Sequence, residues 1–325
     1  MIKTPTGKIS TSRNALLKIK HNIFIDTLLR YRELHKIINT YLVPMRDNLD
    51  ASNRIHAMFS QSRTLTGRLS SSNPINFQNI PSRSELGKQV RKLFIGQNLI
   101  VADMNQIELR ILAHFSKDEN LIKAYKENID VHNQTAKYIF KTDCPTKDQR
   151  FIAKVCNFSL IYGAGCRTLA NAINSSSLNF KVSIEDAQRF IDSFNSLYTQ
   201  FKNWKTVEIQ KTKFLPSPYV VTLLGRSIPV QGIKESNFST LYRAEREVIS
   251  YKIQGSAADI LKKSILDLTE RIPNIILVSS IHDELIIDEG SEDMLNVVKD
   301  CMENSVQRCV PLVVEAKIVS CWGEK

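Results

Sequence analysis

Two apolar runs in this chain of 325 residues lead directly to an aspartate. Residues 98–102 (NLIVA) read as a short buried strand that delivers Asp103 at its C-terminal end. Residues 275–281 and 285–287 read as the two arms of a hairpin, and His282-Asp283-Glu284 forms the turn between them. The pattern therefore predicts two strand-borne carboxylates, the second at a hairpin tip.

A longer periodic segment lies near the N-terminus. Leucine and isoleucine recur at helical spacing over residues 14–43, with basic residues interleaved, and Pro44 follows. Because proline lacks the N–H that a helix interior needs, we expect the helix to end before Pro44.

Four side chains recur every fourth residue further along the chain: Arg150, Lys154, Phe158 and Tyr162. Four residues of an α-helix advance about 400°, so these side chains climb one slowly winding face. A guanidinium and an ammonium suit a polyphosphate, and aromatic rings suit a stacked base. The face matches the polarity of a nucleoside triphosphate, although an amphipathic helix with a solvated basic turn would show the same spacing.

The two aspartates extend this hypothesis. Asp103 and Asp283 would repel each other if the fold brought them together, unless cations lay between them. Mg²⁺ suits such a site because it takes few carboxylates and completes its shell with water and substrate phosphates. Two such ions about 4 Å apart can activate a hydroxyl and stabilise a departing pyrophosphate. The plainer alternative is that each aspartate only ends a strand.

Taken together, these segments resemble the polymerase module of family A DNA polymerases, the DNA polymerase I family. Residues 103–110 are similar to motif A (usually DYSQIELR), residues 150–163 to motif B, and residues 282–284 to the HDE of motif C. Residues 66–71, 78–81, 254–259 and 313–323 are similar to further family segments (TGRLSS, QNIP, QGTAAD and the closing strand). The order and the separations agree over nearly the whole chain.

The resemblance implies an α+β right-hand polymerase fold, with an antiparallel palm sheet, helical fingers and a partial helical thumb. We expect the thumb at residues 1–54, the palm at 55–115 and 240–325, and the fingers at 116–239. Gly225-Arg226 is similar to the family turn that closes the fingers. The thumb is expected to be truncated, with no exonuclease domain before it.

The family also implies the catalytic groups. Asp103, Asp283 and the backbone carbonyl of Met104 would ligate two Mg²⁺ ions, for which Mn²⁺ could substitute. Glu284 would complete the catalytic set. Lys154 would donate a proton to the leaving pyrophosphate.

For the incoming nucleotide, the resemblance implies contacts along the motif B helix and from its neighbours. Glu108 would act as a steric gate that clashes with a 2′-hydroxyl. Phe158 would lie against the sugar, and Tyr162 near the templating position. The complete set of expected nucleotide-binding residues is Arg150, Lys154, Phe158, Tyr162, His132, Glu108 and Gln106.

Primer–template DNA is the implied macromolecular partner. Arg68, Gln254 and His282 would meet the primer terminus and the minor groove, where every base pair presents acceptors to a donor that checks pairing geometry. The complete set of expected DNA-binding residues is Arg68, Gln78, Asn79, Arg83, Arg246, Gln254 and His282.

The implied reaction is template-directed addition of deoxynucleoside triphosphates to a primer 3′-hydroxyl, with release of pyrophosphate. A single-subunit RNA polymerase is the nearest alternative, and Glu108 and the HDE turn favour DNA over RNA. A second alternative is a DNA-binding subunit of a split polymerase, whose partner chain would supply the remaining thumb and the exonuclease.

Charge and cysteine content agree with an enzyme that handles DNA. The formal net charge is +11, and residues 1–102, with 16 Lys and Arg against 5 Asp and Glu, carry all of the excess. A phosphate backbone is the natural partner of such a segment. The 6 cysteines show no metal-binding spacing, which is typical of free thiols in a reducing compartment. Without an apolar run long enough for a membrane span, we expect a soluble intracellular protein of the cytoplasm or nucleoid, with an organelle or a phage-infected cell as open alternatives.

Overall fold

The computed structural model describes residues 6–16, 19, 22–82, 84–176 and 181–324. The chain divides into two compact units. The first unit comprises Met1–Ser60, Ser70–Ile95 and Cys321–Glu324, and the second comprises Gln61–Leu69, Gly96–Ser320 and Lys325. The expected division into thumb, palm and fingers at residues 54, 115 and 239 stays a prediction.

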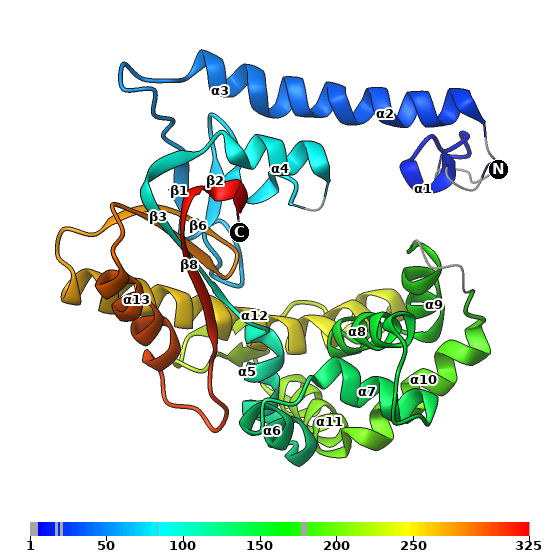
Figure 1. Ribbon diagram of the computed structural model, residues 1–325. Helices are drawn as coiled ribbons and strands as arrows, with labels where there is room; N and C mark the ends of the chain where they lie inside the picture. Colours follow the sequence, from blue (N-terminus) through cyan, green and yellow to red (C-terminus); the bar gives the residue numbers. More distant parts are fainter. Residues whose placement is uncertain (1–5, 17–18, 20–21, 83, 177–180, 325) are drawn as a thin grey trace. The chain divides into compact units, whose positions relative to one another are not determined.

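The first unit is mostly helical and contains one long N-terminal helix (Figure 1). Its elements are α1 Arg13–Leu16, α2 Ile23–Ile37, η1 Ile38–Leu42, α3 Val43–Asp47, β1 Met58–Ser60, β2 Ser70–Ser72, η2 Phe77–Asn79, α4 Glu85–Lys92 and η3 Trp322–Glu324. Near its C-terminal segment, the guanidinium of Arg91 lies 4.0 Å from the ring centre of Trp322, which also meets Phe94 edge-on. These contacts join the last residues of the chain to α4.

The N-terminal helix differs from its prediction at both ends. The side chain of Asn22 accepts a hydrogen bond from Phe24 N–H and caps α2, so this helix begins at Ile23. It does not end before Pro44, because the helix widens to the π-helical turn η1 and continues through α3 to Asp47. Pro44 lies in the first turn of α3, where a missing backbone N–H costs little.

The second unit combines a four-stranded sheet with most of the helices (Figure 1). Apart from the end residues Ile95 and Cys321, its elements are β3 Ile95–Met104, α5 Ile107–Ser116, α6 Glu119–Lys126, α7 Val131–Phe140, α8 Lys147–Ile161, α9 Cys166–Asn174, α10 Ile184–Leu197, α11 Thr199–Phe214, β4 Tyr219–Val221, β5 Ser227–Pro229, α12 Phe238–Arg271, β6 Ile276–Ile281, β7 Glu284–Asp288, α13 Glu292–Asn304 and β8 Val314–Cys321. The expected mixed helical and antiparallel architecture is confirmed.

The sheet of this unit has the strand order β6-β7-β3-β8. Both β6 and β3 pair antiparallel with β7. Residues 99–102 of β3 are all buried, which explains their uninterrupted apolar run. The predicted hairpin is confirmed with one correction: Glu284 is not in the turn but is the first residue of β7, where it lies opposite both Ile281 and Asp103. The turn therefore consists of His282 and Asp283.

The 34-residue helix α12 connects the sheet with the helical part of this unit (Figure 1). It packs against α13, α5 and α11. Ile253 of this helix shares one apolar core with Leu109 of α5 and with Ile287 of β7. This common core fixes the site-bearing elements of the second unit relative to one another.

A buried aspartate of the second unit accepts hydrogen bonds from backbone N–H groups at the starts of two helices. The carboxylate of Asp118 accepts hydrogen bonds from Leu121 N–H at the start of α6 (3.2 Å) and from Phe201 N–H in the first turn of α11 (3.2 Å). The side chain is fully buried, and burial raises its pKa. Its removal would leave backbone donors of two helices without an acceptor.

Asp118→Ala is therefore expected to lower the free energy of unfolding by about 2–4 kcal/mol and to lower the melting temperature by several degrees. Ser183→Ala, which removes the exposed N-cap of α10, is the matched control and should cost only about 1 kcal/mol. Thermal melting of both variants checks this. Equal losses in the two variants would show that Asp118 is an ordinary single cap.

Two further expectations can be compared with the described residues. None of their helices is both long and apolar enough to cross a membrane. All 6 cysteines are unpaired, as predicted.

Candidate active site

Of the two predicted metal-binding aspartates, Asp103 lies in β3, and Asp283 lies in the turn that leads into the neighbouring strand β7. Asp103 is opposite Glu284 in the β3–β7 register, and Met104 N–H donates to the backbone carbonyl of Asp283 over 3.2 Å. Asp283 follows His282, which has a φ of 57° in the tight turn. Burial raises the pKa of Asp283 to about 6, and although Arg68 opposes this, the negative charges of Glu108 and Asp103 add to it. The two carboxylates therefore repel each other across the strand pair.

This electrostatic strain is the property expected of a cation site. Two carboxylates held close together in a partly dry environment lower their energy when divalent cations lie between them. Among the described residues, no group of three or more His, Cys, Asp and Glu side chains forms a metal-binding cluster. The backbone carbonyl of Met104, next to Asp103, stays the further ligand that the family resemblance implies.

Glu108 connects this carboxylate pair to the motif B helix α8. One carboxylate oxygen pairs with Arg68 over 2.5 Å, and the other accepts a hydrogen bond from the hydroxyl of Tyr162, the residue that caps α8. The side chain of Gln254, on α12, also hydrogen-bonds to Tyr162. Burial, with the neighbouring charge of Glu108, raises the pKa of Tyr162, so the hydroxyl stays protonated. Four residues from four segments of the sequence thus form one network.

The predicted helix around motif B is confirmed as α8. A capping box of Thr146 and Gln149 begins it. Arg150 and Lys154 are exposed, and Phe158 and Tyr162 are half-buried, so the face changes from cationic to aromatic as the spacing predicted. The cationic half of this face is exposed to solvent, where a phosphate group could reach it.

Arg150 has a partner that was not predicted. Its Nε donates to Asp130 over 2.6 Å, while the other carboxylate oxygen of Asp130 caps α7. Burial works to raise the pKa of Asp130, but the hydrogen bond and charge of Arg150 outweigh it and hold that pKa below its usual range. A triphosphate would have to share Arg150 with Asp130 or displace it.

His132 is buried beside the same helix. The side-chain amide of Asn157, on α8, forms a hydrogen bond with its Nδ1 over 2.9 Å. Burial lowers the pKa of His132 to about 4; Asp130 opposes this, and the charges of Lys154 and Arg150 add to it. The imidazole is therefore neutral at neutral pH and could contact phosphate only as a neutral donor.

Gln106 occupies the left-handed region (φ 52°) just before α5. Its side-chain oxygen accepts a hydrogen bond from the hydroxyl of Tyr125 over 3.0 Å. The guanidinium of Arg110 lies 4.4 Å from the centre of the Tyr125 ring, with its Nη1 bonded to the carbonyl of Pro311 over 2.6 Å. The network orients Gln106 at the end of the motif A strand.

The expected DNA-binding residues fall in both units. Arg68, Gln254, His282 and Arg246 belong to the second unit, where Arg246 passes against Gly163 just beyond α8. Gln78 and Asn79 belong to the first unit and lie in η2. The carbonyl of Asn79 accepts from the hydroxyl of Tyr41 over 2.5 Å. Arg83 lies outside the described residues.

Sequence reasoning missed the partners of the site residues. Asp130 gave one signal, because an aspartate just before an apolar run is a typical helix N-cap. Asn157 gave another, since a polar amide in a helix interior needs a buried partner. Tyr125 gave no local signal, because it meets Gln106 only through the packing of α6 against α5.

The family model for DNA polymerase family A matches residues 1–324. The DNA polymerase I of Caldicellulosiruptor bescii is 39% identical over 339 residues, which cover 99% of this chain and 38% of that protein. The thermostable DNA polymerase I of Thermus aquaticus is 36% identical over 332 residues, which cover 98% of this chain and 38% of that protein. The chain thus spans well under half the length of these curated relatives.

A solved structure gives the same result for the fold. The POL domain of Pol1 from M. smegmatis, in complex with DNA primer-template and dNTP, superposes with a TM-score of 0.89 and 29% identity over 99% of this chain and 57% of that chain. The agreement extends over both units of the structure. With the motif order, the family-model match and the common fold, the chain belongs to DNA polymerase family A.

Proposed function

We propose that this chain is a DNA-directed DNA polymerase that adds deoxynucleotides to a primer 3′-hydroxyl and releases pyrophosphate. The observation that carries the proposal is the position of Glu108, which contacts Tyr162 of the motif B helix and adds its charge to the field at Asp283. A nucleotide-binding face and a carboxylate pair therefore belong to one site. Relatives named DNA polymerase I, and a similar domain solved with primer-template and dNTP, support the same activity.

Family A DNA polymerases generally depend on divalent metal ions. For this chain we propose two Mg²⁺ ions, held by Asp103, Asp283 and the carbonyl of Met104. When bound, they would lower the pKa of the attacking hydroxyl and neutralise charge on the leaving pyrophosphate. The raised pKa of Asp283 supports this, because burial and the negative charges of Glu108 and Asp103 outweigh the positive charge of Arg68, and a bound cation would relieve that imbalance. Mn²⁺ is expected to substitute.

The motif B helix would hold the triphosphate. Arg150 and Lys154 are the exposed cations of its first half, and Lys154 would give a proton to the leaving group. Arg150 would have to exchange Asp130 for phosphate oxygens, so binding would compete with an ion pair that is already formed. Neutral His132 would donate to a phosphate oxygen. Phe158 would meet the sugar, and Tyr162 would leave Glu108 as the templating base enters.

On the DNA side, Arg68, Gln254 and His282 would contact the primer terminus, with Arg246 close to the template. Gln78, Asn79 and Arg83 stay predictions as further DNA contacts. A primer-extension assay distinguishes this function from the two alternatives. A single-subunit RNA polymerase would extend the primer with ribonucleotides. A DNA-binding subunit of a split polymerase would bind DNA but would not extend the primer until its partner chain is added.

Glu108→Ala is expected to raise ribonucleotide incorporation relative to deoxynucleotide incorporation by roughly tenfold or more, because the clash with a 2′-hydroxyl disappears. Glu108→Gln is the matched control, since it keeps the bulk of the side chain and removes the negative charge that pairs with Arg68 and acts on Tyr162 and Asp283. Single-nucleotide insertion kinetics with both sugars give the ratio. If both variants lost sugar selectivity equally, the charge of Glu108, and not its bulk, would be responsible for excluding ribonucleotides.

A further inference from the structure

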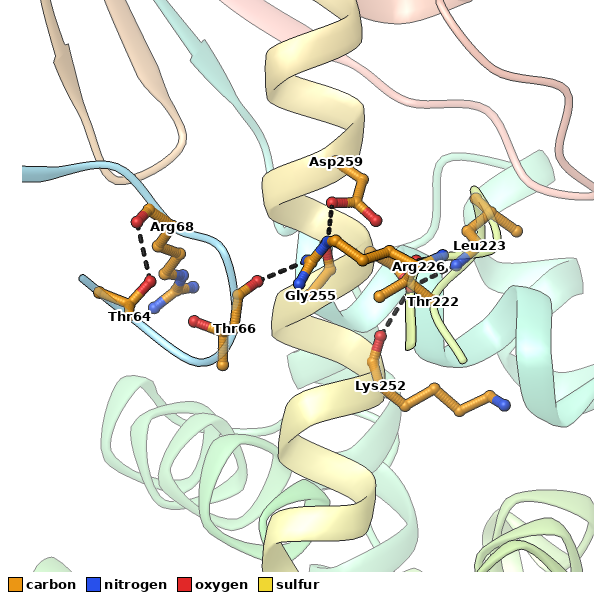
Figure 2. Close-up of polar contacts among 10 residues, drawn as sticks. Thr64, Thr66, Arg68, Thr222, Leu223, Arg226, Lys252, Gly255 and Asp259 are labelled. Carbon is orange, nitrogen blue, oxygen red and sulfur yellow. Dashed lines mark hydrogen bonds and ion pairs between the residues drawn. The ribbon is translucent and has the colours of Figure 1, made fainter. Parts of the chain in front are cut away.

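Arg226 makes a set of contacts that its place in a hairpin turn does not require. Its guanidinium donates from Nε to Asp259 over 2.8 Å, and from Nη2 to the carbonyl of Thr66 over 2.7 Å and that of Gly255 over 3.2 Å (Figure 2). These acceptors come from the loop of residues 61–69 and from two turns of α12. One side chain therefore joins three segments that are distant in the sequence.

Hydrogen bonds fix both the backbone and the side chain of Arg226. Its backbone N–H donates to the hydroxyl of Thr222 over 3.0 Å, which closes the β4–β5 turn (Figure 2). Asp259 is largely buried; its Oδ1 accepts from Arg226, while its Oδ2 has no hydrogen-bond partner in the described structure. The charge of Lys262 also acts on this carboxylate, but Arg226 is the cation that hydrogen-bonds to it, and a buried carboxylate strongly favours such a paired arrangement. Arg226 is thus anchored at both its backbone and its side chain.

The loop that Arg226 contacts is shaped for this contact. Gly67 has a φ of 77°, and a Cβ at this position would lie only 2.7 Å from Nη2 of Arg226. Glycine is therefore required both for the backbone conformation and for the close approach. The hydroxyl of Thr64 donates to the carbonyl of Arg68 over 2.8 Å and closes the turn (Figure 2).

Arg68 follows Gly67 in this turn, and its side chain forms an ion pair with Glu108 over 2.5 Å. The direction of the Arg68 side chain depends on where its backbone is held, and Arg226 holds it one peptide away, at Thr66 and Gly67. We propose that Arg226, anchored by Asp259, is a positioning residue for Arg68: it clamps the turn of residues 64–68 against α12 so that Arg68 can hold Glu108 and meet the primer terminus. This inference rests on the proposed polymerase function.

Lysine at position 226 provides the sharpest test. Arg226→Lys keeps a positive charge beside Asp259 but cannot form the fork that reaches Asp259 and Thr66 together. We expect the kcat/KM for deoxynucleotide insertion to fall roughly ten- to a hundredfold, mainly through kcat, and discrimination against ribonucleotides to weaken. Lys263→Ala, which removes an ion pair with Asp267 on the same helix, is the matched control and should insert like the wild type.

A double-mutant cycle with Arg68→Ala separates positioning from stability. If Arg226 acts through Arg68, Arg226→Lys should lower the kcat/KM for deoxynucleotide insertion by less than about threefold in a protein that already carries Arg68→Ala. Effects that multiply fully in the double variant, or an Arg226→Lys variant that inserts like the wild type, would overturn the inference. Thermal melting of every variant shows whether it folds. If Arg226→Lys does not fold, Asp259→Asn, which removes the carboxylate that anchors Arg226, replaces it in the same double-mutant cycle. If the wild type extends no primer, the proposed function fails and the inference fails with it; if only the coupling is absent, the inference fails alone.

Discussion

Asp103→Ala is expected to lower primer extension at least roughly 10³-fold while DNA binding changes little. The residue supplies one of only two side-chain carboxylates proposed to hold the metal ions, and it ends the strand that pairs with β7. Without it, the attacking hydroxyl would lose its activation and the leaving group its charge neutralisation. The basic residues of positions 1–102, which would contact a phosphate backbone, are unchanged, so affinity for primer–template should persist.

Single-turnover extension and fluorescence anisotropy, measured on the same preparation, check the two halves of this prediction. Asp293→Ala removes an exposed aspartate of α13 and is the matched control, for which both readouts should equal those of the wild type. An Asp103→Ala variant that extends primers within tenfold of the wild type would contradict the assignment of the metal site.

Asp283→Asn is expected to abolish extension to a similar degree and, unusually, to stabilise the metal-free protein. The pKa of Asp283 is raised to about 6 in the folded state, from an ordinary value of 3.8. A raised carboxyl pKa contributes stability that is fully present below the ordinary pKa and is lost as the pH rises through about 6. At pH 8 the ionised side chain therefore destabilises the metal-free fold, by about 3 kcal/mol. Asparagine removes this cost.

Melting curves without metal should then place Asp283→Asn about 4 °C above the wild type at pH 8, with the difference closing as the pH falls toward 4. Added Mg²⁺ should stabilise the wild type at pH 8 and have little effect on the variant. Asp293→Asn, at the exposed control position, should follow the wild type at each pH. A gain that is equal at pH 5 and pH 8 would show that packing, and not charge, determines it.

Local sequence patterns predicted the elements that carry the site. The run of residues 98–102 needs no partner to be recognised as a strand, because its residues 99–102 are all apolar and buried. The four-residue spacing from Arg150 to Tyr162 likewise follows from helix geometry alone. Motif resemblance then placed Asp103 and Asp283 together, and the register confirmed that their strands are neighbours.

Features that depend on long-range contacts were not predictable. Arg226 lies 160 residues from Thr66 in the sequence, and no periodic pattern indicates that the two meet. Asp130 competes for Arg150 only because α7 packs on α8. Pro44 was expected to end a helix, but a π-helical turn, which no residue pattern indicates, places it in a new first turn. Local rules fail where tertiary packing supplies the missing partner.

The most direct test of the account is extension of a labelled primer on a DNA template by this chain alone, with Mg²⁺ and either deoxy- or ribonucleotides. The account predicts template-directed extension with deoxynucleotides, weak extension with ribonucleotides and none by Asp103→Ala. Extension with ribonucleotides as efficient as with deoxynucleotides, or DNA binding without any extension, would contradict it.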